Sequence, residues 1–327
     1  MKRLFTKSFL LMLALLCGCE LVVRVFFARN MSGRFEYGYH PTTGFVERAD
    51  GTVRLVRSGG RRFHPQSFSQ HRPEETFRIL VIGDSVPRGP SLQASYAVQL
   101  GERLRASGMK AESFNLAVPG FGARRNQLVL RQALNYQPSL IILHVNNSNE
   151  FEDTREWQRA QEFKTWHPKN WPMKSLVFRR LYEMKTEKIF WKWLHEKVRD
   201  QAAIRDADAE VNASVNEAKV REWDEQVRRV TTESVALARQ SGVPILLLTQ
   251  AVCLSTKSAQ AQLDDNRLDS LVRPLAGDGV HFLSMKELFE GQAYNTLFSD
   301  GSHLTRSGHI AIAAAIERHL RESKLVP

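Results

Sequence analysis

Cysteine is scarce in this chain of 327 residues. Only three occur, and two of them, Cys17 and Cys19, lie in an apolar N-terminal run. Cys253 is the one cysteine left for a folded domain, so an internal disulfide is excluded there, and we expect a buried small apolar side chain. The sequence also lacks zinc-ligand spacings, internal repeats and the signatures of nucleic-acid-binding modules. We therefore expect no metal, no cofactor and no nucleic-acid partner.

Acidic residues are also few relative to basic ones. The chain has 35 of them against 46 lysines and arginines, which gives a formal net charge of +11. A basic balance favours anionic surroundings, such as phospholipid headgroups or acidic glycans. The length is sufficient for one large domain, or for one domain with an insertion.

An uninterrupted apolar run long enough to span a bilayer is missing from the N-terminus. Three basic residues precede an uncharged run over residues 9–19, which is shorter than the roughly 20 residues that a spanning helix needs. Apolar residues resume at 21–27, and Glu20 and Arg24 are spaced to pair on one helix face, which lowers the cost of burying their charges. We predict that residues 1–29 are an uncleaved signal-anchor, a single transmembrane segment that leaves the folded domain extracytoplasmic, in the periplasm.

Two other interpretations of this segment stay open. The first is a signal peptide that is cleaved, although no clear Ala-x-Ala site follows the apolar run. The second is a lipoprotein signal, because Leu16-Cys17-Gly18-Cys19 loosely resembles a lipoprotein box with Cys19 as the lipidated residue. The three interpretations differ in whether the segment is removed, and in whether the protein is held at the membrane by a transmembrane helix, by a lipid on Cys19 or not at all.

Strands and helices alternate beyond a linker over residues 30–75, which has little periodicity and is expected to pack in part on the domain. Continuous apolar strands that alternate with helices are typical of a parallel sheet covered on both faces. The domain then spans residues 76–327. The predicted strands are 77–84, 113–118, 140–146, 243–252 and 280–284, and the predicted helices are 93–106, 125–136, 223–240 and 305–322, the last with Thr305 as N-cap.

An insertion of about residues 152–222 separates the two halves of this pattern. All six tryptophans lie within it or at its edge, and between Lys164 and Arg199 there are ten basic residues and three acidic ones. One interpretation is a helical subdomain whose aromatic residues form a small core. The other is a lid or platform with exposed tryptophans and basic residues, which would suit a membrane interface or an acyl or sugar substrate.

The most informative motif follows the first predicted strand. The apolar run ends at Gly83-Asp84-Ser85, so Ser85 is placed at the tip of a buried strand. A serine becomes a good nucleophile only when a base takes its proton and donors bind the oxyanion. Near the other end of the chain, Asp300 and His303 lie three residues apart, before the last helix. Because ligands bind beyond the carboxyl ends of parallel strands, we expect Ser85, Asp300 and His303 to meet at one edge of the sheet.

These motifs resemble those of the SGNH (GDSL-type) hydrolase family, serine esterases and acyltransferases with a flavodoxin-like α/β fold. The resemblance covers Arg78 to Phe151 and Val243 to about Arg321. The family's second block is similar to Asn115-Leu116-Ala117-Val118-Pro119-Gly120, and its third, Gly-x-Asn-Asp, is similar to Asn147-Ser148-Asn149-Glu150, with Asn and Glu at the two ends. The pattern from Glu20 to Arg24 also resembles the N-terminal anchors of membrane-tethered members.

The resemblance implies a three-layer α/β/α fold with a five-stranded parallel sheet and a helical insertion. It implies a catalytic triad and an oxyanion hole with these members: Ser85 as nucleophile, His303 as base, Asp300 as its partner, and Ser85, Gly120 and Asn149 as oxyanion donors. Whether Asn149 or Asn147 donates stays open. The predicted function is hydrolysis of a carboxylic ester, the O-acyl group of a glycan or lipid. Two alternatives are an acyltransferase acting on an envelope polysaccharide and a non-catalytic glycan- or lipid-binding module on the same fold.

Overall fold

The computed structural model describes most of the chain outside the insertion. The described residues are 2–27, 44–58, 61–150, 153–154, 157–158, 161, 165–178, 181, 221–252 and 267–326. Cys253, residues 28–29 of the predicted signal-anchor, residues 30–43 and 59–60 of the predicted linker, and most of the predicted insertion lie outside them.

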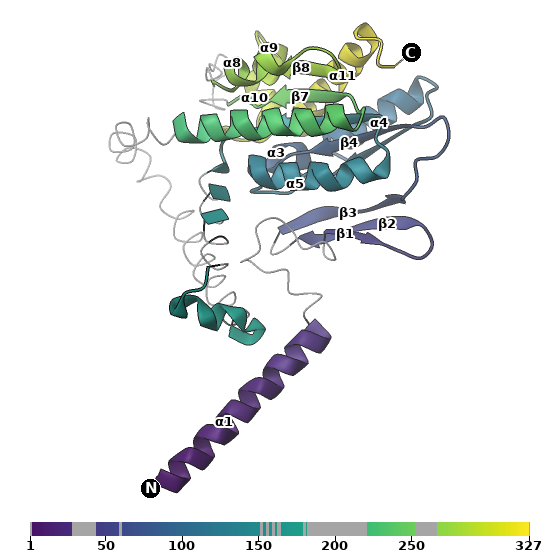
Figure 1. Cartoon of the computed structure of the whole chain (residues 1–327). Helices are drawn as coiled ribbons and strands as arrows, with labels where there is room; N and C mark the ends of the chain where they lie inside the picture. The colour runs from purple at the N-terminus through teal and green to yellow at the C-terminus, as the bar shows by residue number, and fades with distance from the viewer. Residues whose placement is uncertain are drawn as a thin grey trace.

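The main sheet has five parallel strands in the order β5-β4-β6-β7-β8 (Figure 1). Numbered along the chain within this sheet, the order is 2-1-3-4-5, that of flavodoxin-like doubly wound folds. The three central strands are buried along almost their whole length, because helices cover both faces of the sheet. The predicted fold class and all five predicted strands are thus confirmed. The strands are β4 (Phe77–Ile82), β5 (Ala111–Asn115), β6 (Leu140–Val145), β7 (Ile245–Thr249) and β8 (Val280–Ser284).

Helices cover both faces of this sheet. One face packs against α4 (Tyr96–Ala106) and α11 (Arg306–Glu322), and the other against α5 (Ala123–Ala133) and a helix over residues 221–240. The predicted N-cap is confirmed, since the Thr305 hydroxyl accepts a hydrogen bond of 3.2 Å from the Gly308 backbone N–H. The short helices are α3 (Ser85–Arg88), η2 (Leu134–Tyr136), η3 (Pro168–Lys174), α8 (Leu268–Val272), η4 (Arg273–Leu275), α9 (Met285–Phe289) and α10 (Tyr294–Leu297).

A second, antiparallel sheet lies within the stretch assigned to the linker. Its strands are β1 (Phe45–Glu47), β2 (Thr52–Ser58) and β3 (Arg61–Ser69). Phe45 stacks on Tyr136 of the domain with ring centroids 5.6 Å apart, and Phe68 lies 4.8 Å from Phe114. These strands were not predicted from the sequence, because Arg, Gly and His residues interrupt the apolar alternation. Residues 45–69 are therefore part of the packed structure.

The Gln66 side chain joins this second sheet to the first. Its Nε2 donates to the Asn115 carbonyl at 2.8 Å, and its Oε1 accepts from the Asn115 N–H at 3.0 Å. β5 is an edge strand of the main sheet, and an exposed edge presents unpaired backbone groups. One glutamine amide thus satisfies both backbone groups of an edge residue.

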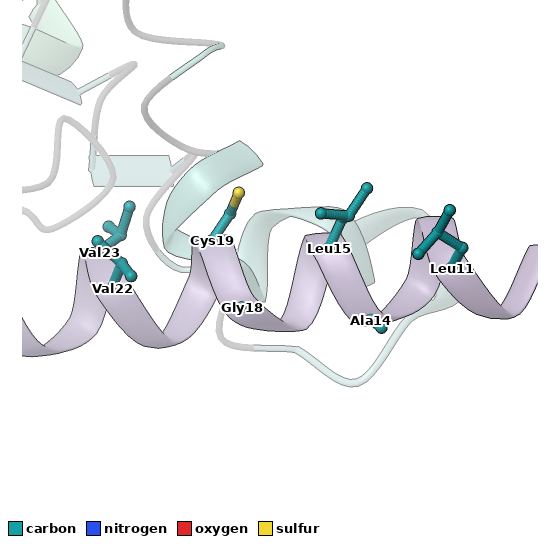
Figure 2. Close-up of a pocket in the computed structure, with 7 residues that line it drawn as sticks. All are labelled: Leu11, Ala14, Leu15, Gly18, Cys19, Val22 and Val23. Atoms are coloured by element: carbon teal, nitrogen blue, oxygen red, sulfur yellow. The ribbon is translucent and has the colours of Figure 1, made fainter.

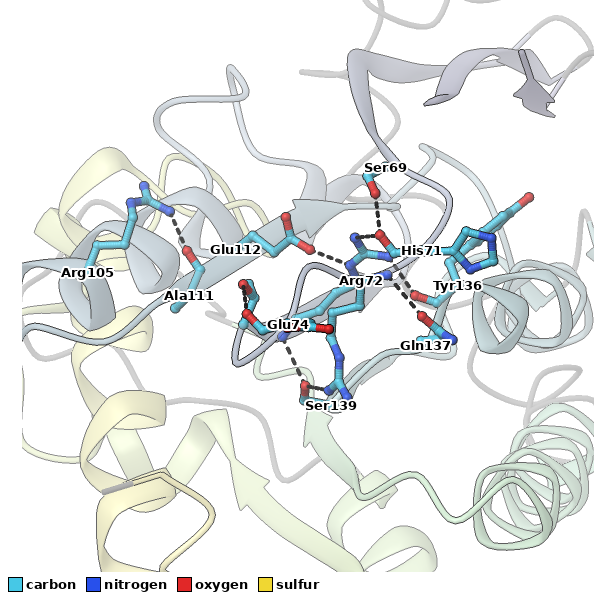
Figure 3. A network of polar contacts seen from close by, with 12 residues as sticks. Ser69, His71, Arg72, Glu74, Arg105, Ala111, Glu112, Tyr136, Gln137 and Ser139 are labelled. Atoms are coloured by element: carbon cyan, nitrogen blue, oxygen red, sulfur yellow. Dashed lines mark hydrogen bonds and ion pairs between the residues drawn. The ribbon is translucent and has the colours of Figure 1, made fainter. Parts of the chain in front are cut away.

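A buried arginine fixes the amino-terminal end of the main sheet. Arg78 on β4 is fully buried, donates to the Glu112 carboxylate on β5, and donates to the Tyr136 carbonyl at 2.7 Å. Figure 3 labels Glu112, Tyr136 and His71, which accept hydrogen bonds from this guanidinium. Burial lowers the pKa of Arg78, and the ion pair with Glu112 opposes that shift. This network lies at the end of the sheet away from Ser85, so its contribution is to stability.

The N-terminal helix α1 (Lys2–Val22) continues into a π-helical turn over Val23–Phe27. Among the side chains of this segment that the structure describes, ten large apolar ones are exposed, with exposed fractions of 46% to 69%. A shallow groove along it is lined only by its own residues, among them Leu11, Leu15 and Cys19 (Figure 2). Among the described residues, no helix meets the length and apolarity needed for a membrane crossing.

Candidate active site

Ser85 stands directly beyond the carboxyl end of β4, as the first residue of the single-turn helix α3. Asp84 caps this turn, because its Oδ1 accepts a hydrogen bond of 3.0 Å from the Val86 N–H. The Asp84 side chain is 1% exposed, whereas Ser85 is partly exposed. The turn therefore holds the Ser85 hydroxyl at the edge of the sheet on a rigid support.

Position 83 has no room for a side chain, so it requires a glycine. A Cβ at this position would lie 2.5 Å from Cγ of Pro87 and 2.9 Å from Cβ of His144, closer than packed carbon atoms approach. Pro87 belongs to the turn that follows Ser85, and His144 lies on the neighbouring strand β6. The glycine thus allows the serine turn to fold back tightly against the sheet.

His303 contacts both Ser85, which is 218 residues away in the sequence, and Asp300. Its Nε2 lies 2.9 Å from Ser85 Oγ, and its Nδ1 lies 2.8 Å from Asp300 Oδ2. With Asp300 accepting from Nδ1–H, Nε2 is the acceptor for the serine O–H. All three residues that the sequence analysis expected at one edge are brought into one hydrogen-bonded line.

Asp300 also organises the loop that carries the histidine. Its Oδ1 accepts from the backbone N–H groups of Ser302 at 2.8 Å and His303 at 2.7 Å, which closes a tight turn. Partial burial raises the pKa of Asp300, but these two backbone hydrogen bonds and the contact with His303 outweigh it, so the net shift is downward. The Asp300 and His303 side chains are 56% and 45% exposed, so the site is open to water.

The structure separates the asparagines of the third block. Asn149 Nδ2 donates to Asp84 Oδ2 at 2.8 Å, which places its amide beside the Ser85 turn. Asn147 Nδ2 instead donates to Asp224 on the helix over residues 221–240, at 3.1 Å. Asn146, which the sequence analysis did not single out, also donates to Asp84 Oδ2, at 2.7 Å. Of the two asparagines left open by the sequence, Asn149 is the one held next to the serine.

Gly120 lies in the turn that follows β5. The chain from Leu116 to Val118 runs along the end of β4, with hydrogen bonds from the Leu116 N–H to the Val81 carbonyl (2.7 Å) and from the Val118 N–H to the Gly83 carbonyl (3.0 Å). Gly120 then adopts a φ of +72°, in the left-handed region that favours glycine. This path brings the Gly120 turn to the same edge of the sheet as Ser85.

A buried carboxylate supports that turn from below. Glu150 is fully buried, and its Oε1 accepts a hydrogen bond of 2.6 Å from the N–H of Ala123, the first residue of α5. Gln226 donates to the other carboxylate oxygen. Burial, together with the nearby Asp153 carboxylate, raises the pKa of Glu150 to about 7. Sequence reasoning noted Glu150 only as a departure from the third block.

A chain of buried polar side chains runs beneath the site. Gln250, just beyond β7, donates to the Ser302 carbonyl at 3.0 Å and accepts from His144 Nε2 at 2.7 Å. The other His144 nitrogen lies 3.3 Å from the Tyr96 hydroxyl, and the Tyr96 N–H donates to His309 Nδ1 at 3.3 Å. Burial lowers the pKa of both histidines, to about 4 for His309. A polar residue directly after a buried strand is the only sequence signal that could have indicated Gln250.

The residues that the structure describes contain no group of three or more His, Cys, Asp or Glu side chains placed to hold a metal ion.

Comparisons with known proteins find similar structures only. No protein-family model matches the chain, and no curated protein matches it. An acetyl xylan esterase is 12% identical and has a TM-score of 0.46, covering 75% of this chain and 100% of its own. A GDSL-like lipase from Bacteroides thetaiotaomicron is 10% identical (TM-score 0.42, 78% and 93% covered). AlinE4, an SGNH-hydrolase family esterase, is 15% identical (TM-score 0.38, 77% and 98% covered). At these identities and TM-scores the similarity carries no conclusion about activity.

Proposed function

We propose that this protein is a serine esterase of the SGNH type that hydrolyses a carboxylic ester. The observation that carries the proposal is the line of hydrogen bonds from Ser85 Oγ through the His303 ring to Asp300, at 2.9 Å and 2.8 Å. A hydroxyl, an imidazole and a carboxylate in this order form the arrangement that activates a serine for attack on an acyl carbon.

The proposed mechanism follows from this geometry. His303 Nε2 takes the proton of Ser85 as Oγ attacks the ester carbonyl, and Asp300 stabilises the imidazolium that forms. His303 then gives the proton to the leaving alcohol. A water molecule, activated by the same nitrogen, attacks the acyl-enzyme and releases the acid.

The oxyanion needs donors on the other side of the serine. We assign this role to the backbone N–H groups of Ser85 and Gly120 and to the side-chain amide of Asn149. Asn149 uses one N–H on Asp84, and an amide nitrogen has two. Each donor of this kind lowers the barrier by about 3 kcal/mol in enzymes where it has been removed.

Hydrolysis is favoured over acyl transfer by the exposure of the site. The His303 and Asp300 side chains are about half exposed, so water reaches the acyl-enzyme freely. A transferase must exclude water until the acceptor hydroxyl is bound. We propose that the ester is an O-acyl group of a glycan or a lipid. The two alternative functions are an acyltransferase and a non-catalytic binding module, and the experiment below distinguishes them from an esterase.

We also propose that the N-terminal segment holds the domain at a membrane, on its extracytoplasmic side. Exposed apolar residues occur at consecutive positions of α1, for example Leu10, Leu11, Met12 and Leu13, and so lie on all sides of the helix. A helix that is apolar all round needs an apolar environment on every side, which a lipid phase supplies.

The test of the catalytic proposal is labelling of the full chain with a fluorophosphonate. We expect the wild-type protein to be labelled and both Ser85→Ala and His303→Ala to lose the label. Ser148→Ala and His71→Ala are matched controls, since both residues are exposed, and they should be labelled like the wild type. A folded wild-type protein without label would favour the binding module. If a polysaccharide acceptor reduces the labelling, and acyl groups from an ester substrate appear on that acceptor, the result would favour the transferase.

A further inference from the structure

Glu20, near the end of α1, and Arg24, in the π-helical turn after it, contact the distant residues 174–177. The Glu20 carboxylate accepts hydrogen bonds from Ser175 Oγ (2.8 Å), the Leu176 N–H (2.9 Å) and the Val177 N–H (3.1 Å). Arg24 forms an ion pair with Glu20 at 2.8 Å. Three donors on one carboxylate make a specific contact, unlike a single exposed ion pair.

Arg24 completes the contact from the other side. Its Nη2 donates to the Lys174 carbonyl at 3.2 Å, while its Nε donates to Glu20 at 2.9 Å. The two side chains therefore hold both the end of η3 and the turn that follows it. The sequence predicted that Glu20 and Arg24 pair with each other, but not that the pair binds residues about 155 positions away. We call this set of contacts the Glu20–Arg24 clamp.

The segment that the clamp contacts carries exposed aromatic residues. Trp166 is 77% exposed and Trp171 is 54% exposed, and their rings lie edge to face with centroids 5.8 Å apart. In Figure 1 this segment lies next to the end of α1 that is nearer the domain. Leu21 in α1 and Phe26 in the π-helical turn, both within a few residues of the clamp in sequence, are 63% and 69% exposed. Large apolar side chains on two segments that meet are thus left uncovered together.

The chemistry of this surface fits a lipid headgroup layer. Tryptophan has an apolar body and one polar N–H, and it concentrates at the boundary between hydrocarbon and water. The surrounding sequence is basic, which suits anionic headgroups. The Glu20 charge is balanced by Arg24 and by backbone N–H groups, so it can lie close to hydrocarbon at reduced cost. A flat protein partner would cover only one side of α1, whereas its apolar residues lie on all sides.

We propose that the Glu20–Arg24 clamp holds residues 165–178 as an interfacial platform, with Trp166 and Trp171 inserted at the headgroup level of a membrane. This inference rests on the membrane half of the proposed function and goes beyond it, because it assigns a second contact with lipid and the residues that position it. The platform fixes the height and orientation of the domain above the bilayer, which a single flexible tether would not do.

The experiment uses the full chain reconstituted into vesicles of phosphatidylethanolamine and phosphatidylglycerol, with acyl chains brominated either near the headgroup or near the chain end. Bromine quenches the emission of tryptophans that it approaches. We expect stronger quenching from the headgroup-proximal label, and loss of most of this quenching in the double variant Trp166→Phe/Trp171→Phe. The matched control is Trp157→Phe/Trp223→Phe, since both of those side chains are only partly exposed. Undiminished quenching in the first double variant would overturn the proposal.

The clamp is tested by Glu20→Ala, with Glu225→Ala as control because Glu225 forms an ion pair with Arg228 on the surface of the domain. Glu20→Ala should still float with vesicles but lose the headgroup-proximal quenching, and Glu225→Ala should keep it. Wild-type quenching in Glu20→Ala would overturn the role of the clamp. Hydrolysis of a soluble ester, expected to be unchanged in all variants, reports folding of the domain. A wild-type chain that fails to float would overturn the membrane half of the proposed function, whereas flotation without headgroup quenching would overturn the platform alone.

Discussion

The buried carboxylate of Glu150 accepts a 2.6 Å hydrogen bond from the backbone N–H of Ala123, and this contact joins two loops of the site. Glu150 follows Asn149 directly, and Ala123 begins the helix that follows the Gly120 turn. A carboxylate at a helix N-terminus is favourable when it is ionised, because the first N–H groups of a helix carry partial positive charge. Burial acts in the opposite direction and raises the pKa to about 7.

Glu150 should therefore make stability depend on pH. Its pKa is raised from 4.5 to about 7 on folding, so the folded state holds the proton more tightly than the unfolded state. The contribution of protonated Glu150 to the free energy of unfolding is complete below pH 4.5. It is lost as the pH rises to about 7, a change on the order of 3 kcal/mol. Glu150→Gln should remove this slope, which urea unfolding at several pH values would measure. Equal slopes in the wild type and in Glu150→Gln would contradict the prediction.

Asp300→Asn should retain the loop but impair catalysis. An asparagine oxygen still accepts from the Ser302 and His303 N–H groups, but its NH₂ group would face His303 Nδ1 and favour the wrong tautomer. By comparison with other serine hydrolases, kcat should fall on the order of 10³- to 10⁴-fold. The control is Asp278→Asn, in an exposed turn, which should keep wild-type kcat on a soluble ester. Retained activity in Asp300→Asn would remove Asp300 from the mechanism.

Asp300 should also stabilise the fold in its ionised form. Its pKa lies below the ordinary value of 3.8, because backbone hydrogen bonds outweigh partial burial. A lowered carboxyl pKa adds stability above pH 3.8, and this stability is lost as the pH falls through the folded-state value. Acid unfolding of the wild type and of Asp300→Asn would show it as a larger loss in the wild type. An identical acid transition in the two proteins would show that Asp300 contributes nothing measurable.

Gln250 is expected to position His303 through the Ser302 carbonyl. Gln250→Met keeps the volume but removes the donor to Ser302 and the acceptor for His144, at a cost of about 1–3 kcal/mol in stability. A displaced loop should lower kcat roughly 10- to 100-fold with little change in KM. Ile316→Val, in the core of α11, controls for lost stability and should leave kcat unchanged. If both variants keep wild-type kcat, Gln250 has a structural role alone.

Gly83→Ala should affect both stability and activity. Its Cβ would press on Pro87 and His144, and such overpacking typically costs about 1–3 kcal/mol. Because Gly83 precedes Asp84 and Ser85, relief of the clash would shift the nucleophile. Gly108→Ala is the comparison, since open space surrounds it but its φ is +87°, so it should lower stability alone. Urea unfolding and ester hydrolysis of the two variants would separate the effects, and a fully active, stable Gly83→Ala would contradict this account.

The core of the fold was predictable because its signals are local. The three central strands are apolar almost throughout, and the alternation of strands with amphipathic helices permits few arrangements. The meeting of Ser85, Asp300 and His303 was predictable for a similar reason, since each lies beyond the carboxyl end of a strand or enters the last helix. Topology then brings such residues to one edge.

The parts that were not predicted depend on contacts between distant residues. The strands over residues 45–69 are stabilised by Tyr136 and Asn115 of the domain, partners that no local pattern reveals. The choice of Asn149 over Asn147 depends on Asp84 and Asp224, which lie far from both in sequence. The catalytic roles, the membrane anchor and the domain boundaries stay predictions, to be tested by the experiments above.

The hydrogen bond between Ser85 and His303 joins residues 218 positions apart, with the base just before the last helix. On the proposed mechanism, a growing chain therefore contains the nucleophile long before it contains the base. Because a domain generally folds as a unit, we expect His303 to reach Ser85 only once the last part of the domain has been made. We therefore expect the proposed esterase activity to appear only after nearly the whole chain has been synthesised.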